Sequence, residues 1–198
     1  GVLVGAIAGM SRGWVDTVLM WLTDLFLSLP QLPLLLLVIY LFRDTLKAAF
    51  GTEVGVFMLI VVVIGGLRWM PVARLVRAQF FSLREKEFVE AARALGASVP
   101  RQVVRHILPN AMAPMIVQLS FLFAYAVLTE ATLSFLGVGA VPPTPTWGNI
   151  MAEGRDFMRE APWIITIPGV MLMITVMGLN LLGDGLRDVL DPRLRIQQ

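Results

Sequence analysis

The polar residues that could do chemistry are concentrated in one stretch between two apolar segments. It reads Glu87-Phe88-Val89-Glu90-Ala91-Ala92-Arg93-Ala94-Leu95-Gly96-Ala97-Ser98 and continues to Arg105-His106-Ile107-Leu108-Pro109-Asn110. Glu90 offers a carboxylate to a basic or amide group of a partner. Ala91 and Ala92 have side chains small enough for another surface to approach the backbone closely. The stretch therefore indicates recognition of another molecule.

The spacing of the apolar residues predicts how this stretch folds. One helix carries an apolar stripe at positions i, i+3, i+4 and i+7, formed by Phe88, Ala91, Ala92 and Leu95. Ser82 and Glu85 fit a capping box at its start. Gly96 suits its C-terminal end, where a positive φ costs glycine little.

A second helix is predicted after the glycine turn. Ser98 suits its N-cap, and Pro100 is tolerated in its first turn. Its apolar pattern is expected to stop where Pro109 interrupts it, because proline has no amide N–H. The alternative for the whole stretch is an amphipathic helix that lies on the lipid surface.

The composition places the rest of the chain in a membrane. Of its 198 residues, 57% are hydrophobic and 15% are charged, and the mean hydropathy is +0.77. Soluble domains carry about 25% charged residues. Backbone groups in lipid must be hydrogen-bonded internally. We therefore expect an all-α fold, a polytopic transmembrane helical bundle that forms one domain over residues 1–198.

Four uncharged stretches approach the roughly 20 residues that a crossing helix needs, namely 25–42, 54–67, 107–129 and 161–183. The second is short, but its helix can continue through Trp69 and Val72. Residues 1–10 are apolar and too short to span, so we expect an N-terminally truncated helix there and about five membrane segments in all. Pro30 and Pro33 are expected to bend the helix over 25–42.

Arginine and lysine predict the orientation, because cytoplasmic loops carry an excess of them. One set of loops holds twelve of the 16 basic residues, namely Arg12, the eight from Arg68 to Arg105, Arg187, Arg193 and Arg195. This distribution predicts that the loop 77–110 and the C-terminus face the cytoplasm. The loop 137–162 is then extracytoplasmic.

Residue types disfavour catalysis by this chain. There is no cysteine and one histidine, His106, whereas a metal site usually needs several such ligands. The two lysines, Lys47 and Lys86, do not follow a glycine-rich phosphate loop. Asp184 lacks a second carboxylate at similar depth to form a catalytic pair. We expect no catalytic residue, no metal ligand, no bound cofactor and, without a known reader motif, no nucleic-acid partner.

The sequence resembles a known family of membrane proteins. Glu90-Ala91-Ala92, Gly96 and Ile107-Leu108-Pro109 are similar, residue by residue, to the loop of permease subunits of ATP-binding-cassette (ABC) importers. Further strings resemble the dipeptide, oligopeptide and nickel branch of these permeases, at 74–77, 106–110, 128–137, 142–149 and 180–188. The resemblance extends over nearly the whole chain.

The resemblance implies a bundle like that of type I ABC importers, in which the loop 77–110 forms the coupling helix that docks on an ATPase. The implied contact residues are Glu90, Ala91, Ala92, Leu95, Gly96, Ile107, Leu108 and Pro109. The implied partners are cytoplasmic ABC ATPase subunits that hydrolyse ATP with Mg²⁺, a substrate-binding protein outside, and a second permease. The family norm is a heterodimer, and pairing of two copies is the alternative. The implied location is the prokaryotic plasma (inner) membrane.

For the transported cargo and for the translocation path, the resemblance leaves alternatives. Peptides are favoured, nickel or glutathione are alternatives within the family, and a stand-alone channel or secondary transporter is the alternative from another class. Glu130, in an apolar segment, is a candidate for the translocation path, or it is hydrogen-bonded between helices. Trp147 and Asn149 are candidates for contact with the binding protein, or they pack the loop on the bundle.

Overall fold

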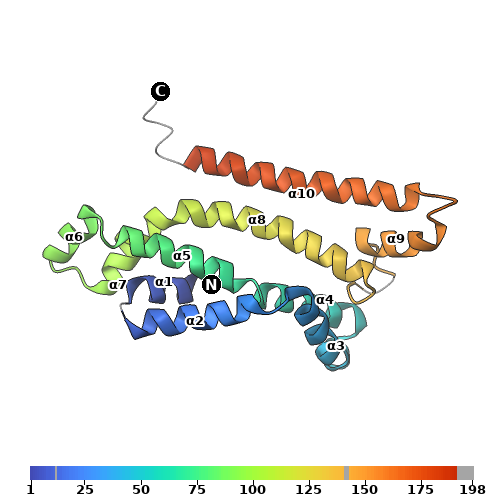
Figure 1. Ribbon diagram of the computed structural model, residues 1–198, viewed down its shortest axis with the longest axis horizontal. Coiled ribbons are helices and arrows are strands. Elements are labelled where there is room, and N and C mark those ends of the chain that lie inside the picture. Colours follow the sequence, from blue (N-terminus) through green and yellow to red (C-terminus); the bar gives the residue numbers. More distant parts are fainter. Residues whose placement is uncertain (12, 141–142, 191–198) are drawn as a thin grey trace. The chain divides into compact units, whose positions relative to one another are not determined.

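The computed structural model describes residues 1–11, 13–140 and 143–190, and the regular elements in these ranges are helices (Figure 1). They are α1 (Val2–Met10), α2 (Trp14–Ser28), α3 (Gln31–Phe50), α4 (Thr52–Gly66), α5 (Trp69–Leu83), α6 (Glu87–Ala94), α7 (Val99–Gln102), α8 (Leu108–Phe135), α9 (Trp147–Gly154) and α10 (Trp163–Leu190). A π-helical turn, Val103–Ile107, links α7 to α8, and a 3₁₀ turn, Arg155–Phe157, follows α9. The all-α prediction is confirmed. The predicted features at Arg12, at loop positions 141 and 142, and at Arg193 and Arg195 lie outside the described residues.

The chain forms two compact units, each built from separate segments. Unit 1 comprises 1–29, 68–119 and the described residues from 184 onward, and unit 2 comprises 30–67 and 120–183. Each unit has its own apolar core. The polar stretch, here called the α5–α8 connection (residues 84–107), belongs to unit 1. The single domain expected over 1–198 stays a prediction.

Glycines bring α1 and α5 together in unit 1 (Figure 1). Gly1, Gly5 and Gly9 recur at every fourth position and share one face of α1. A Cβ atom at Gly5 would lie 2.5 Å from the carbonyl oxygen of Ala73, and one at Gly9 would lie 2.6 Å from Cβ of Phe80. Glycine therefore permits a backbone separation that a larger residue would prevent, as in other small-residue interfaces of membrane helices.

The core of unit 1 joins α5 to the α5–α8 connection. Its buried members are Val76, Phe80, Val89, Ile107 and Ala111. Ala6 and Met10 of α1 pack against this cluster. Helix α6, the π-helical turn and α1 are therefore fixed on one apolar surface.

Two ion pairs join α2 to α5 within unit 1. Asp16 accepts hydrogen bonds from Nε and Nη2 of Arg77, both at 2.5 Å. Asp24, about two helical turns further along α2, accepts two from Arg74 on one oxygen, from Nη2 at 2.5 Å and from Nε at 3.2 Å. The two-pronged contact of Arg77 fixes orientation as well as distance. The Asp24 pair is more than half exposed, so its contribution to stability is small.

Unit 2 contains a hairpin of α3 and α4. Gly51, with a φ of +83°, makes the turn between them. Gly55 of α4 packs directly against the backbone of Leu46 in α3. Leu133 of α8 completes a core whose other buried members come from the hairpin, namely Leu35, Ile39, Val56, Leu59, Ile60 and Val63.

Three helical stretches among the described residues are long and apolar enough to cross a membrane, namely 52–83, 99–135 and 163–190. They include the predicted stretches 54–67 and 107–129 and nearly all of 161–183. A fourth arises if α2 and α3 are counted as one broken span. Helix α1 has nine residues, fewer than a crossing requires.

The helix predicted over 25–42 is interrupted. Leu29 and Pro30 are extended, and they separate α2 from α3. Pro30 has no amide N–H to continue α2, and it disfavours helical conformation at the residue before it. The expected bend at Pro30 is confirmed. Pro33 does not break the helix, because it lies in the first turn of α3, where no N–H donor is needed.

Replacing a packed glycine tests the α1–α5 contact. Gly5→Ala is expected to destabilise the protein by roughly 1–3 kcal/mol, because its methyl group would overlap the α5 backbone. The control is Gly178→Ala, since a Cβ at Gly178 meets nothing within 4 Å. Thermal unfolding in mild detergent measures both variants. A Gly5→Ala protein that unfolds at or above the parent temperature would contradict the close packing.

Candidate partner-docking site

Helix α6 begins later than the sequence predicts. Helix α5 continues to Leu83, whose side chain packs against the unit 1 core near Phe80. Ser82 therefore stays inside α5, and Lys86 occupies the N-cap position of α6 without a side-chain capping bond. The predicted capping box of Ser82 and Glu85 is wrong, because tertiary packing of α5 overrides the local signal.

The predicted apolar stripe of α6 is divided between two directions. Of its four members, Ala92 is buried, at 8% exposed. Beside Ala92 lies Val89, which is completely buried in the unit 1 core. The other three members are exposed, with Leu95 at 89% and Phe88 at 41%. Val89, which is not part of the stripe, takes the place in the core and turns Phe88, Ala91 and Leu95 outward.

The exposed residues of α6 form a surface suited to a partner. We define the docking face as Phe88, Glu90, Ala91 and Leu95, all of which are exposed. Exposed apolar side chains grouped on a protein surface commonly mark an interaction site. Glu90 lies about 160° around the helix from Phe88, so its negative charge stands at the edge of this surface. The face therefore combines apolar contact with a charged group that can select its partner.

The glycine turn after α6 has the predicted geometry. Gly96 has a φ of +81°. Its N–H donates to the carbonyl of Arg93 at 2.9 Å, and the N–H of Ala97 donates to the carbonyl of Ala92 at 3.0 Å. These two bonds satisfy the last carbonyls of α6 in the arrangement of a Schellman motif. A Cβ at Gly96 would meet nothing within 4 Å, so conformation alone favours glycine here.

The second helix of the connection continues further than predicted. Ser98 occupies the N-cap position of α7, although its side chain makes no capping bond. Pro109 does not end the helix, because α8 begins at Leu108 and runs through it. The π-helical turn Val103–Ile107 comes directly before α8. Local π-helical adjustments of this kind give new partners to the backbone groups that proline, without an N–H, leaves unpaired.

The predicted contact residues differ in their exposure. Glu90, Ala91, Leu95, Gly96 and Pro109 are exposed, Ala92 and Ile107 are buried, and Leu108 is half-buried. The buried members hold the connection on the core, and the exposed members are the ones that a partner could touch.

Arg84 is the residue of this site that sequence reasoning missed. It is buried, and its Nη1 donates to the carbonyls of Gly9 at 2.8 Å and Ser11 at 3.1 Å. Those carbonyls lie more than 70 positions earlier in the chain. No local spacing pattern signals such a contact, so only the packing of α1 on α5 reveals it.

Comparison with known proteins decides the family. Residues 1–196 match the family described as binding-protein-dependent transport system inner membrane component. The chain belongs to this family. The match confirms the resemblance read from Glu90-Ala91-Ala92 and the accompanying strings.

Individual relatives are transport permeases. The chain is 43% identical to a putative peptide transport system permease protein of Brucella suis biovar 1, over 98% of this chain and 63% of that protein. It is 38% identical to a dipeptide transport system permease protein of Alkalihalophilus pseudofirmus, over 98% and 60%. It is also 38% identical to an oligopeptide transport system permease protein of Mycobacterium bovis, over 97% and 63%. The chain therefore spans about three fifths of the length of these relatives.

Glu130 makes its hydrogen bond within its own helix. The hydroxyl of Ser134 donates to Oε1 of Glu130 at 2.5 Å and accepts the N–H of Ala140 at 3.1 Å. Glu130 thereby supports the turn that follows α8. Its neighbours Thr129 and Thr132 line a cavity of about 290 Å³ in unit 2, and Glu130 does not. Its role in a translocation path stays a prediction.

Asn149 holds the segment before α9. Its backbone N–H donates to Oγ1 of Thr146 at 3.2 Å, and its side-chain amide donates to the carbonyl of Ala140 at 2.9 Å. Trp147 lines an apolar cavity of about 370 Å³ that Trp163 also lines. These contacts show how both residues are positioned, and their contact with a binding protein stays a prediction.

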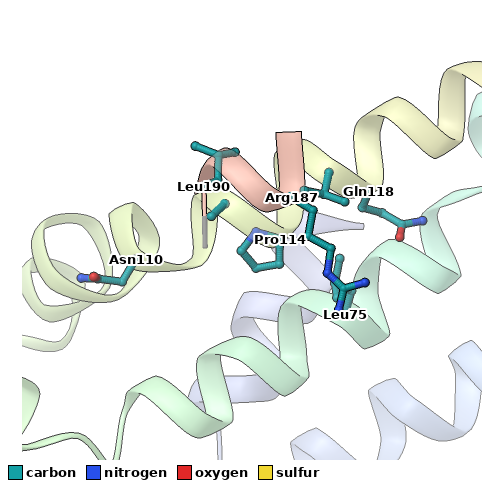
Figure 2. Close-up of a pocket in the computed structure, with 8 residues that line it drawn as sticks. Leu75, Asn110, Pro114, Gln118, Arg187 and Leu190 are labelled. Atoms are coloured by element: carbon teal, nitrogen blue, oxygen red, sulfur yellow. The ribbon is translucent and has the colours of Figure 1, made fainter. Parts of the chain in front are cut away.

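A cavity of about 410 Å³ lies in unit 1 (Figure 2). Apolar residues such as Leu75, Pro114 and Leu190 line it together with Arg187 and Gln118. Figure 2 shows the Arg187 side chain extending past Pro114 toward Leu75. None of the predicted contact residues lines this cavity.

The described residues contain no candidate metal site. Within residues 1–11, 13–140 and 143–190, no group of three or more His, Cys, Asp or Glu side chains could hold a metal ion. The expectation that this chain binds no cofactor stays a prediction.

A substitution at Gly96 tests the turn. Gly96→Val is expected to cost roughly 1–2 kcal/mol, because a side chain disfavours the left-handed conformation. The loosened turn should make trypsin cleave faster at Arg93 and Arg101, which flank it. Gly185→Val provides the comparison, because it adds the same residue at a helical glycine with open space around it. Equal cleavage rates at the flanking arginines in Gly96→Val and the parent would contradict the strained turn.

Proposed function

We propose that this protein is a membrane-spanning permease subunit of an ATP-driven ABC importer of dipeptides or oligopeptides. The observation that carries the proposal is the docking face of α6, exposed on one side and buried on the other, in a chain of the binding-protein-dependent transport family. Apolar side chains such as Phe88 and Leu95 gain free energy when a partner removes them from water. The proposed partner at this face is a cytoplasmic ABC ATPase subunit.

The remaining partners follow from the family. A second homologous permease completes the translocation path, normally as a heterodimer, and an extracytoplasmic substrate-binding protein delivers the cargo. The ATPase subunits, not this chain, bind and hydrolyse ATP with Mg²⁺. The excess of basic residues supports a cytoplasmic position for the α5–α8 connection and the C-terminus. The proposed location is the prokaryotic plasma membrane.

The packing of α6 supports a route from the ATPase to the membrane helices. Closure of an ATP-bound ATPase dimer would displace the docking face. Val89 shares a buried core with Phe80 of α5 and Ile107 of the π-helical turn. Because protein interiors are close-packed and transmit strain, a displacement of α6 would pass to α5 and to the start of α8.

Peptides are the proposed cargo because the relatives named above are described as peptide, dipeptide and oligopeptide permeases. Nickel or glutathione would use the same docking chemistry. Uptake of labelled dipeptides by the assembled transporter, with nickel and glutathione as competitors, distinguishes these cargoes.

A charge placed on the docking face should prevent assembly. Leu95→Asp is expected to abolish co-purification of the ATPase subunit, because a carboxylate would replace an apolar contact. Its matched control, Leu95→Met, keeps the apolar surface and should retain the ATPase. Mass analysis of the full chain purified in mild detergent measures both. Retention of stoichiometric ATPase by Leu95→Asp would exclude the docking face as the contact. A parent homo-oligomer without ATPase, under conditions that preserve a control transporter, would favour a stand-alone channel or secondary transporter.

Removal of the Glu90 carboxylate should weaken coupling without unfolding the chain. Glu90 is exposed and has no packing role in the core, so Glu90→Ala is expected to lower substrate-stimulated ATPase activity and uptake several-fold. Glu160→Ala, another exposed glutamate outside the connection, should leave both rates at the parent level. Parent-like uptake and ATPase activity in Glu90→Ala would remove Glu90 from the proposed contact.

A further inference from the structure

Arg84 occupies an unusual position for a charged residue. It lies between α5 and α6 and is only 6% exposed. Arginine is almost never buried to this extent unless its charge is compensated. The carboxylate within 4 Å of it in the described residues is Glu85, at 3.9 Å from Nη2, and that carboxylate is more than half exposed. The Asp16 carboxylate also attracts Arg84, although the two form no direct ion pair. The burial therefore requires another source of stabilisation.

The end of α1 supplies that stabilisation. The last carbonyls of a helix lack partners within the helix and carry partial negative charge. Nη1 of Arg84 donates to the carbonyls of Gly9 and Ser11 at this end, and its Cζ lies 4.2 Å from the centre of the Phe81 ring. A planar guanidinium can stack on a ring and donate to two carbonyls at once, which an ammonium group does less well.

The Arg84 contact is the last of three that fasten α1 to α5 and to the α5–α8 connection. Gly5 and Gly9 place α1 directly on the α5 backbone. Met10 packs on the cluster that contains Val89 of α6. Arg84 makes the third contact, because it lies in the short turn between α5 and α6 and its side chain binds the C-terminal end of α1.

We propose that Arg84 is a positioning residue that makes α1 move together with α6. The buried Val89 carries a displacement of α6 to the end of α5, and Arg84, the C-cap residue of α5, carries it on to the end of α1. Without the Arg84 bonds, the end of α1 is not held to the C-terminal end of α5. With them, the end of α1 follows the base of α6. The fastening itself stands on the geometry, and the proposed function enters only as the source of the displacement.

The absence of cysteine from the sequence permits a direct distance measurement. Leu3→Cys in α1 and Glu87→Cys in α6 replace exposed residues, and spin labels on both report the α1–α6 distance in the full chain in lipid nanodiscs. The distribution is expected to be narrow with Arg84 and broader in the Arg84→Lys variant. An unchanged distribution in Arg84→Lys would overturn the fastening, and this arm requires no ATPase.

The second arm uses the assembled transporter without nucleotide and with ATP bound. The mean α1–α6 distance is expected to stay constant when Arg84 is present and to shift with ATP in Arg84→Lys. Uptake per ATP hydrolysed should fall several-fold in Arg84→Lys, although the ATPase remains bound. Arg159→Lys, a substitution at an exposed arginine outside the connection, should leave this ratio unchanged.

The two arms separate failure of the inference from failure of the proposed function. A parent distance that changes on ATP binding would show that α1 and α6 move independently, and would overturn the inference while the transporter works. A parent chain that binds no ATPase would refute the proposed function, and the first arm would still decide whether Arg84 fastens α1 to α6. Retained ATPase binding by Arg84→Lys identifies a folded variant, so loss of coupling there is not loss of the fold.

Discussion

The burial of Val89 decides what the α5–α8 connection can do. It has no exposed surface and shares the core of unit 1 with Phe80 and Ile107. Side chains on a helix are fixed relative to one another by its period. With Val89 turned inward, Phe88, about 100° away around the helix, and Leu95, at the C-cap, remain exposed. One buried valine therefore both anchors α6 and leaves an apolar surface exposed beside it.

Local signals in the sequence were reliable where one residue decides the conformation. The turn at Gly96 was predictable because a positive φ is a property of a single position, and the break at Pro30 because proline lacks an N–H. The start of α6 was not predictable, because Ser82 stays helical through the packing of its neighbour Leu83. Pro33 was misjudged for a related reason, since its effect depends on where α3 begins.

Contacts between distant segments were beyond the reach of sequence patterns. The spacing of Gly1, Gly5 and Gly9 was readable, but its meaning required knowing that α5 lies against them. Arg84 could not be distinguished from a solvated charge until the end of α1 was placed beside it. In the docking face, the structure exposes three of the expected contact residues, Glu90, Ala91 and Leu95, and buries Val89, which the predicted stripe did not include. Their contact with a partner stays a prediction.

The π-helical turn Val103–Ile107 accommodates one residue more than an α-helical turn. One residue corresponds to about 100° of rotation in an α-helix, so this turn sets the angular phase of α8 relative to α7. The same residues in an uninterrupted α-helix would present a different face of α8, and Ala111 would leave the core of unit 1. In the evolution of this chain, an insertion or deletion of a single residue here is therefore equivalent to rotating an entire membrane-crossing helix.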